Sequence, residues 1–142
     1  MADLVGSWRL VSHEEHKADG TVVPLWGTSV GGRLTYDADG RMAVQVMNPA
    51  RRSFAVADSL AGTTDEVREA FEGYIAYYGS YAVDAEHGVI THHVEGSLYP
   101  NFIGTHLRRA FQLSGRRLRL ETPPMVVGGR TSTYVLTWER EG

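Results

Sequence analysis

The sequence predicts an all-β fold in which about eight antiparallel strands close into a barrel with one short helix. Short segments with alternating apolar and polar residues recur along the chain, separated by turn residues at close spacing. Only one segment has the periodicity of a helix. The 142 residues suit a single domain, 1–142, that is large enough to bury a core. Closure removes the exposed edges that an open sheet of this size would have.

The predicted strands lie between clear turn signals. Residues 37–40, Asp-Ala-Asp-Gly, have the chemistry of a tight hairpin turn and join strands at 31–36 and 41–47. Asn48-Pro49 ends the second of these strands, because proline has no N–H to donate to a sheet. The remaining strands are predicted at residues 8–14, 80–84, 89–97, 105–113, 117–121 and 131–139.

One helix is predicted at residues 64–78. Thr63 and Glu66 have the spacing of a capping box, which marks a helix start. Gly79 stands where a glycine commonly ends a helix. The preceding residues 50–62 show no period and are predicted to form a loop across the barrel mouth. The residues of the apolar helical stripe are Val67, Ala70, Phe71, Tyr74, Ile75 and Tyr78.

Composition and charge exclude several functional classes. A formal net charge of −3 argues against a dedicated nucleic-acid binder, which normally has a strong basic bias. The chain has no cysteine, which excludes disulfides, zinc–thiolate sites and a cysteine nucleophile. Neither a signal-peptide pattern nor an apolar run of about 20 residues is present, so we expect a cytoplasmic protein without a membrane partner. No motif predicts a cofactor, because the glycine pairs lack a phosphate-loop context.

The densest polar cluster lies in the predicted strand 89–97. Neighbouring residues in a strand point to opposite faces, so His92 shares its face with the apolar Ile90. His93 shares the other face with Glu95. This pattern favours His92 as the residue that faces the interior, where it could act as a ligand contact or as a general acid or base. The alternative buries His93 and Glu95 together, which requires a partner for the carboxylate.

Arg109 is the second candidate interior residue, because it lies between the apolar Leu107 and Phe111 on the same face of its strand. A guanidinium offers a fixed fork of donors that suits a ligand carboxylate, enolate or carbonyl. A buried structural ion pair, with Glu95 for example, is the alternative interpretation.

Further polar and aromatic residues can face the same interior by parity. Gln45 shares a strand face with Ala43 and Met47 and could add an amide to the cavity, although an outward glutamine in solvent is the favoured interpretation. The expected ligand-binding residues are therefore Tyr36, Gln45, Tyr81, His92, Arg109 and Tyr134. No metal site is predicted, because the available histidines and Glu95 lack zinc-ligand spacing and a nearby arginine would repel a cation.

Several stretches resemble a known family. Gly6-Ser7-Trp8 resembles the Gly-X-Trp signature of lipocalins, in which the tryptophan closes the barrel floor. Over nearly its whole length the chain is similar to the bacterial lipocalin-like domain family, a small calycin-type β-barrel. The resemblance implies a lipocalin-like fold with Arg140 stacked on Trp8. Leu107 replaces a glutamine that is frequent in such proteins, which implies a more apolar cavity. The matching stretches are LTYD at 34–37, GRM at 40–42, GYIAYYG at 73–79, THHVEGS at 91–97, PN at 100–101, TPP at 122–124 and WER at 138–140.

Two functions remain open at this level. The first is a binding module that holds a small apolar or amphipathic, oxygen-bearing molecule in the barrel cavity. The alternative is a cofactor-independent isomerase or cyclase acting on a polyketide-like small molecule in the same cavity. Its catalytic residues would be His92, His93, Glu95 and Arg109. The first function needs fewer assumptions. In either case the expected partner is a small molecule, and a homodimer is left open.

Overall fold

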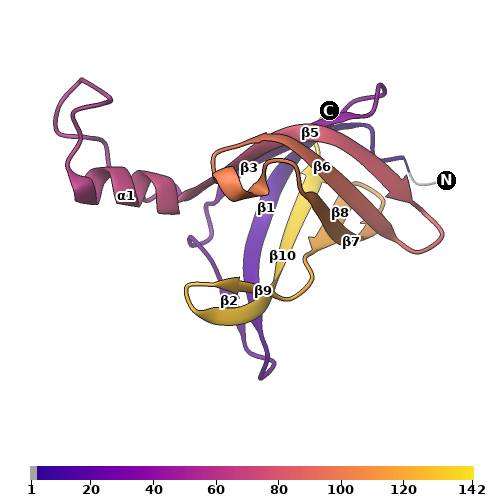
Figure 1. Ribbon diagram of the computed structural model, residues 1–142. Helices are drawn as coiled ribbons and strands as arrows, with labels where there is room; N and C mark the ends of the chain where they lie inside the picture. Colours follow the sequence, from indigo (N-terminus) through magenta and orange to yellow (C-terminus); the bar gives the residue numbers. More distant parts are fainter. Residues whose placement is uncertain (1–2) are drawn as a thin grey trace.

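The computed structural model describes residues 3–142 and confirms the all-β barrel with one α-helix in that part of the chain (Figure 1). Ten strands form one antiparallel sheet in the order β2-β1-β3-β4-β5-β6-β7-β8-β10-β9. Because β1 also pairs with β10, eight of these strands close into a barrel. The strands are β1 (Gly6–Lys17), β2 (Val22–Pro24), β3 (Gly31–Tyr36), β4 (Arg41–Met47), β5 (Tyr74–Asp84), β6 (Val89–Ser97), β7 (His106–Ser114), β8 (Arg117–Glu121), β9 (Met125–Val127) and β10 (Arg130–Arg140).

Four of the predicted strands have the observed bounds: β3, β4, β6 and β8. The sequence does not predict β2 and β9, which have three residues each and lie at the two ends of the strand order. Both are too short to show an alternation of their own. They pair with the ends of β1 and β10, which are longer than predicted because the two strands continue to pair beyond the barrel wall.

The prediction of a helix at residues 64–78 is correct at its start but wrong at its end. The helix α1 (Thr64–Glu72) begins with the predicted capping box but ends at Gly73, whose N–H bonds back to Glu69 and Phe71. Tyr74 to Tyr78 instead belong to β5 and pair with β4. The apolar residues there satisfy a period of 2 as well as 3.6, and backbone pairing with a neighbouring strand decides between them. Gly79 is therefore not a helix cap.

The segment of residues 48–73, which we call the arm, contains α1 and projects from the end of β4 and β5 (Figure 1). The prediction that residues 50–62 cross the barrel mouth is therefore wrong. No residue of α1 is buried, and Val67 and Phe71 are about half exposed, so the helical part of the predicted stripe does not pack on the barrel. No helix among residues 3–142 has the length and apolar character needed to cross a membrane.

The barrel floor matches the expectation for Trp8. Its side chain is fully buried, and its Nε1 donates a hydrogen bond to the carbonyl oxygen of Leu4 at 3.0 Å. The Arg140 guanidinium lies 4.2 Å from the centre of the Trp8 ring and donates hydrogen bonds to the carbonyl oxygens of Val5 and Asp3. The tryptophan and the stacked arginine thus tie the start of the chain to its end.

Gly79→Ala should lower the free energy of unfolding by about 1–3 kcal/mol, the range for overpacking a close contact. A Cβ at this position would collide with the carbonyl oxygen of His93, where a bulge brings β5 and β6 together. Gly31→Ala is the matched control, because a Cβ there would first meet the flexible end of Met47 at 3.2 Å. Urea denaturation measures both variants, and equal midpoints would contradict the close approach at Gly79.

Candidate functional site

His92 faces the barrel interior, as the alternation in β6 favours, and is 2% exposed. Its Nε2 lies 2.7 Å from the Tyr36 hydroxyl, and its Nδ1 lies 2.8 Å from the Tyr77 hydroxyl. The two tyrosines come from β3 and β5 and are themselves buried. The sequence predicts Tyr36 at this site but not Tyr77, because Tyr77 lies within the predicted helix 64–78. Three strands therefore hold a Tyr–His–Tyr chain inside the barrel.

The electrostatics of this chain keep all three groups uncharged at neutral pH. Burial lowers the pKa of His92 to about 3, and the charge of Arg109 acts in the same direction. Burial raises the pKa of Tyr36 well above its ordinary value and also raises the pKa of Tyr77. A neutral imidazole has one N–H and one lone pair. One tyrosine therefore donates to His92, while the other accepts from it and keeps its own O–H hydrogen free for another acceptor.

Arg109 lies on the inner face of β7, between Leu107 and Phe111, which pack against the core. Its Nη1 donates to the carbonyl oxygen of Arg108 at 3.0 Å, which leaves further guanidinium donors. Arg109 pairs with Ile90, two residues from His92 on the neighbouring strand β6, and its charge counters the rise of both tyrosine pKa values. The inward side chains of β7 keep accessible surface, whereas Ile90, His92 and Val94 on the neighbouring β6 are buried.

Two other predicted residues face inward and one does not. The Tyr81 hydroxyl donates to the carbonyl oxygen of Asp37 at 2.7 Å, and its ring lies 4.7 Å from that of Tyr36. Tyr134 is 8% exposed. Gln45 points outward, which corrects its assignment to the cavity: its Oε1 accepts a hydrogen bond from the Tyr74 hydroxyl on the outer face. The strand alternation that buries its neighbours in β4 forces this direction.

The four residues proposed for catalysis are not assembled. His93 and Glu95 lie on the outer face of β6, away from His92 and Arg109, so the alternative that buries them together is wrong. Their direction follows from the inward position of His92 in the same strand. The His93 ring instead contacts that of His106 on β7, with 2.6 Å between their Nδ1 atoms. In the described part of the chain, no group of three or more acidic or histidine side chains could hold a metal ion.

A second interior polar cluster, which the residue pattern does not predict, lies on β1. Alternation places Ser12 beside Trp8 and Leu10, but a bulge after Leu10 shifts the phase and turns His13 and Glu15 inward. His13 is 5% exposed and Glu15 is 1% exposed. Nothing in the residue pattern signals this bulge, although a buried acid beside a histidine is the kind of cluster that marks functional sites.

Glu15 is held by donors from β10. Its carboxylate accepts hydrogen bonds from Arg130 Nη2 at 3.2 Å and Nε at 3.3 Å, and from Ser132 Oγ at 2.7 Å. These bonds, led by Arg130, lower the pKa of Glu15, so it is ionised at neutral pH. The neighbouring His13 contacts aromatic rings: Trp26 lies edge-on at 4.9 Å and Tyr134 at 6.3 Å. Burial lowers the pKa of His13 to about 4.

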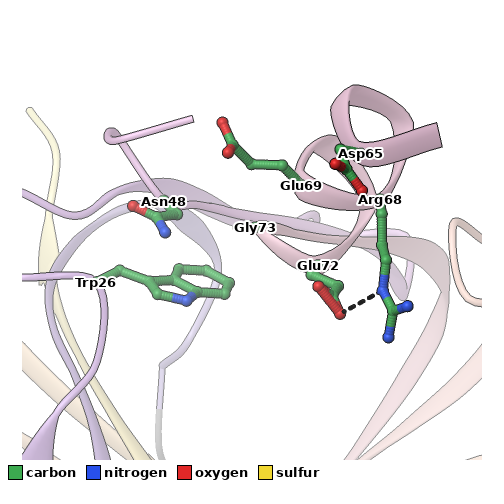
Figure 2. A pocket seen from close by; sticks show the side chains of 7 residues that line it. All are labelled: Trp26, Asn48, Asp65, Arg68, Glu69, Glu72 and Gly73. Atoms are coloured by element: carbon green, nitrogen blue, oxygen red, sulfur yellow. Dashed lines mark hydrogen bonds and ion pairs between the residues drawn. The ribbon is translucent and has the colours of Figure 1, made fainter. Parts of the chain in front are cut away.

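Trp26 also lines a hollow of about 410 Å³ between the barrel and the arm (Figure 2). Its backbone has a φ of 62°, a left-handed conformation that is strained for a bulky residue. A smaller hollow of about 280 Å³ lies on the outside of β7 and β8. The other residues that line the first hollow are Asn48, Asp65, Arg68, Glu69, Glu72 and Gly73.

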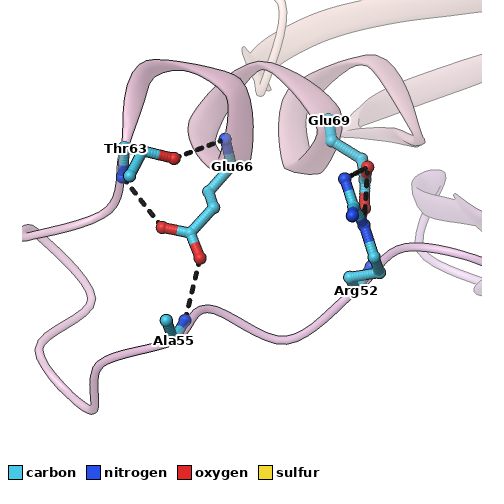
Figure 3. A network of polar contacts seen from close by, with 5 residues as sticks. All are labelled: Arg52, Ala55, Thr63, Glu66 and Glu69. Atoms are coloured by element: carbon cyan, nitrogen blue, oxygen red, sulfur yellow. Dashed lines mark hydrogen bonds and ion pairs between the residues drawn. The ribbon is translucent and has the colours of Figure 1, made fainter.

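The arm that forms one side of this hollow is held by its own polar contacts (Figure 3). Glu66 completes the capping box with Thr63 and also accepts from the backbone N–H of Ala55 at 2.8 Å. Glu69 accepts hydrogen bonds from the backbone and the guanidinium of Arg52. These contacts join the loop to α1 without using the barrel.

Comparisons with known proteins agree with this architecture. A family model described as a lipocalin-like domain matches residues 5–141. The 4'-hydroxy-3'-methoxypropiophenone carrier protein of Aspergillus oryzae is 35% identical over 106 residues, which cover 70% of this chain and 96% of that protein. The crystal structure of a lipocalin-like protein from Bacteroides uniformis superposes with a TM-score of 0.50 at 17% identity, covering 99% of this chain and 100% of that chain. The structural similarity supports the fold alone.

Proposed function

Because the chain belongs to the lipocalin-like domain family, we propose that it binds a small, mostly apolar, oxygen-bearing molecule inside the barrel. The observation that carries this proposal is the Tyr36–His92–Tyr77 chain beside Arg109, set among apolar side chains. A ligand site of this kind combines an apolar wall with a few polar groups that fix the orientation of the ligand.

The chemistry of these polar groups favours a ligand with an acceptor oxygen. Arg109 can only donate hydrogen bonds, and the tyrosine that accepts from His92 also has a hydrogen to donate. A carbonyl, enolate or phenolate oxygen is the complementary group. The relative from Aspergillus oryzae is named as a carrier of an aromatic ketone, which combines an apolar ring with a carbonyl acceptor. This supports an aromatic ketone as the ligand class.

The same geometry favours binding over isomerase or cyclase chemistry. Both ring nitrogens of His92 are occupied, and a pKa of about 3 makes its imidazole a weak base at neutral pH. His93 and Glu95, which an enzyme mechanism would need nearby, lie on the outer face. A carrier or binding protein requires neither of them.

Arg109→Met should weaken the binding of 4'-hydroxy-3'-methoxypropiophenone about 10- to 100-fold, the scale of a charge-assisted hydrogen bond. Methionine keeps much of the side-chain volume while removing the donors. Isothermal titration calorimetry measures the affinity, and thermal unfolding verifies that the variant folds.

Arg108→Met is the matched control, because Arg108 is exposed on the outer face of the same strand. This variant should bind the ketone as tightly as the parent protein does. Parent affinity in a folded Arg109→Met variant would refute the role of Arg109 in binding. A parent protein that does not bind the ketone would refute the proposed ligand class.

A further inference from the structure

His13 has a polar atom that the protein leaves without a partner. The side chain is only 5% exposed, and its buried Nδ1 has no hydrogen bond within the described residues. A buried polar group without a partner is unfavourable, so such a group in a native protein requires an explanation. The adjacent Glu15 does not supply one, because its carboxylate bonds to Arg130 and Ser132.

The strand order places His13 across the barrel from His92. In the closed barrel, β1 and β6 are four strands apart in either direction around the wall. Both histidines point inward, so their side chains approach the interior from opposite sides. A molecule that contacts Arg109 and the tyrosines with one end, and that is long enough to cross the barrel, would reach the wall that contains His13.

The surroundings of His13 suit an aromatic ring. The Trp26 ring meets the imidazole edge-on with an interplanar angle of 82°, and the Tyr134 ring lies on another side. Aromatic rings prefer such edge and tilted arrangements. Trp26 also lines the hollow beside the arm, which places His13 next to an accessible part of the protein.

We propose that His13 Nδ1 binds a hydroxyl group on the ring of the ligand, so that the barrel selects hydroxylated aromatic ketones over those without the hydroxyl. A hydroxyl can both donate and accept, and it therefore pairs with Nδ1 in either tautomer of the neutral imidazole. This inference rests on the proposed function. It adds a ring hydroxyl at the end of the ligand that lies away from Arg109.

The test compares two ketones that differ by one hydroxyl. The parent protein should bind 4'-hydroxy-3'-methoxypropiophenone about three- to tenfold more tightly than 3'-methoxypropiophenone, the scale of one hydrogen bond. His13→Phe keeps an aromatic ring against Trp26 but removes the polar atom, and its ratio of affinities should fall to about 1. His13→Asn returns a polar atom near the position of Nδ1 and should restore part of the preference.

His16→Phe is the matched control. His16 lies on the same strand, with its Nε2 bonded to Glu14, and the preference should persist in this variant. If His13→Phe does not fold, nuclear magnetic resonance of the parent protein provides a second measurement. The His13 Nδ1 signal should shift with the hydroxylated ketone and not with the other.

The outcomes separate the two proposals. Equal affinity of the parent protein for both ketones, or a preference that His13→Phe retains, would overturn the role of His13, and its Nδ1 would then meet water only. The proposed function would still stand if Arg109→Met weakened both ketones. If the parent protein bound neither ketone, the proposed ligand class and the inference that rests on it would both fall.

Discussion

His92→Leu should lower the free energy of unfolding by about 2–6 kcal/mol. The substitution leaves the hydroxyls of Tyr36 and Tyr77 buried without their shared partner, and each unpaired group costs about 1–3 kcal/mol. Denaturation in urea, monitored by circular dichroism, measures the change. His93→Leu is the control on the same strand, and because His93 faces outward it should change stability by only about 0.5 kcal/mol.

A triple variant tests the physical reason. Combining His92→Leu with Tyr36→Phe and Tyr77→Phe replaces all three polar partners by apolar groups of similar shape. Such replacement of every partner is close to neutral when the shapes match. The triple variant should therefore recover at least half of the stability lost in His92→Leu. A triple variant that is less stable than His92→Leu would show that packing, and not the unpaired hydroxyls, causes the loss.

Trp8→Ala should lower the free energy of unfolding by about 3–5 kcal/mol, the range for removing a large buried aromatic residue. The loss combines an empty volume at the barrel floor with the release of Arg140, which lies against the Trp8 ring. Because Arg140 bonds to the backbone at Asp3 and Val5, the start of β1 should open first. Chemical denaturation measures the stability, and hydrogen exchange locates the opening.

Trp26→Ala is the control for the loss of an indole ring. Trp26 is only partly buried, so its removal should cost less than half as much. Similar losses for the two tryptophans would argue against a special role of Trp8 in closing the floor. A Trp8→Ala midpoint equal to that of the parent would make the Gly6-Ser7-Trp8 match accidental.

Residue pattern and turn chemistry predict much of the barrel because both are local properties. The Asp-Ala-Asp-Gly turn determines where β3 ends and β4 begins, and both strands have their predicted bounds. The sequence predicts the inward direction of His92 correctly, because the apolar Ile90 and Val94 lie on the same face of β6. The Thr63 capping box likewise marks the start of α1.

The errors concern features that depend on distant contacts. The stretch from Tyr74 to Tyr78 fits a helix and a strand equally, and only its pairing with β4 decides the outcome. That error also removed Tyr77 from the predicted site. A bulge in β1 turned His13 and Glu15 inward against the local alternation. Bulges arise from how two strands meet, so the sequence of one strand does not reveal them.

The arm leaves the barrel and returns to it at a single point. Met47 at the end of β4 pairs with Tyr74 at the start of β5, and the N–H of Asn48 donates to the carbonyl oxygen of Gly73 at 2.8 Å. Changes in the length of the arm therefore leave every strand pairing of the barrel intact. Insertions and deletions can accumulate there during evolution at little cost to the barrel. The arm can thus vary around the hollow beside Trp26 without altering the strands that hold the interior residues.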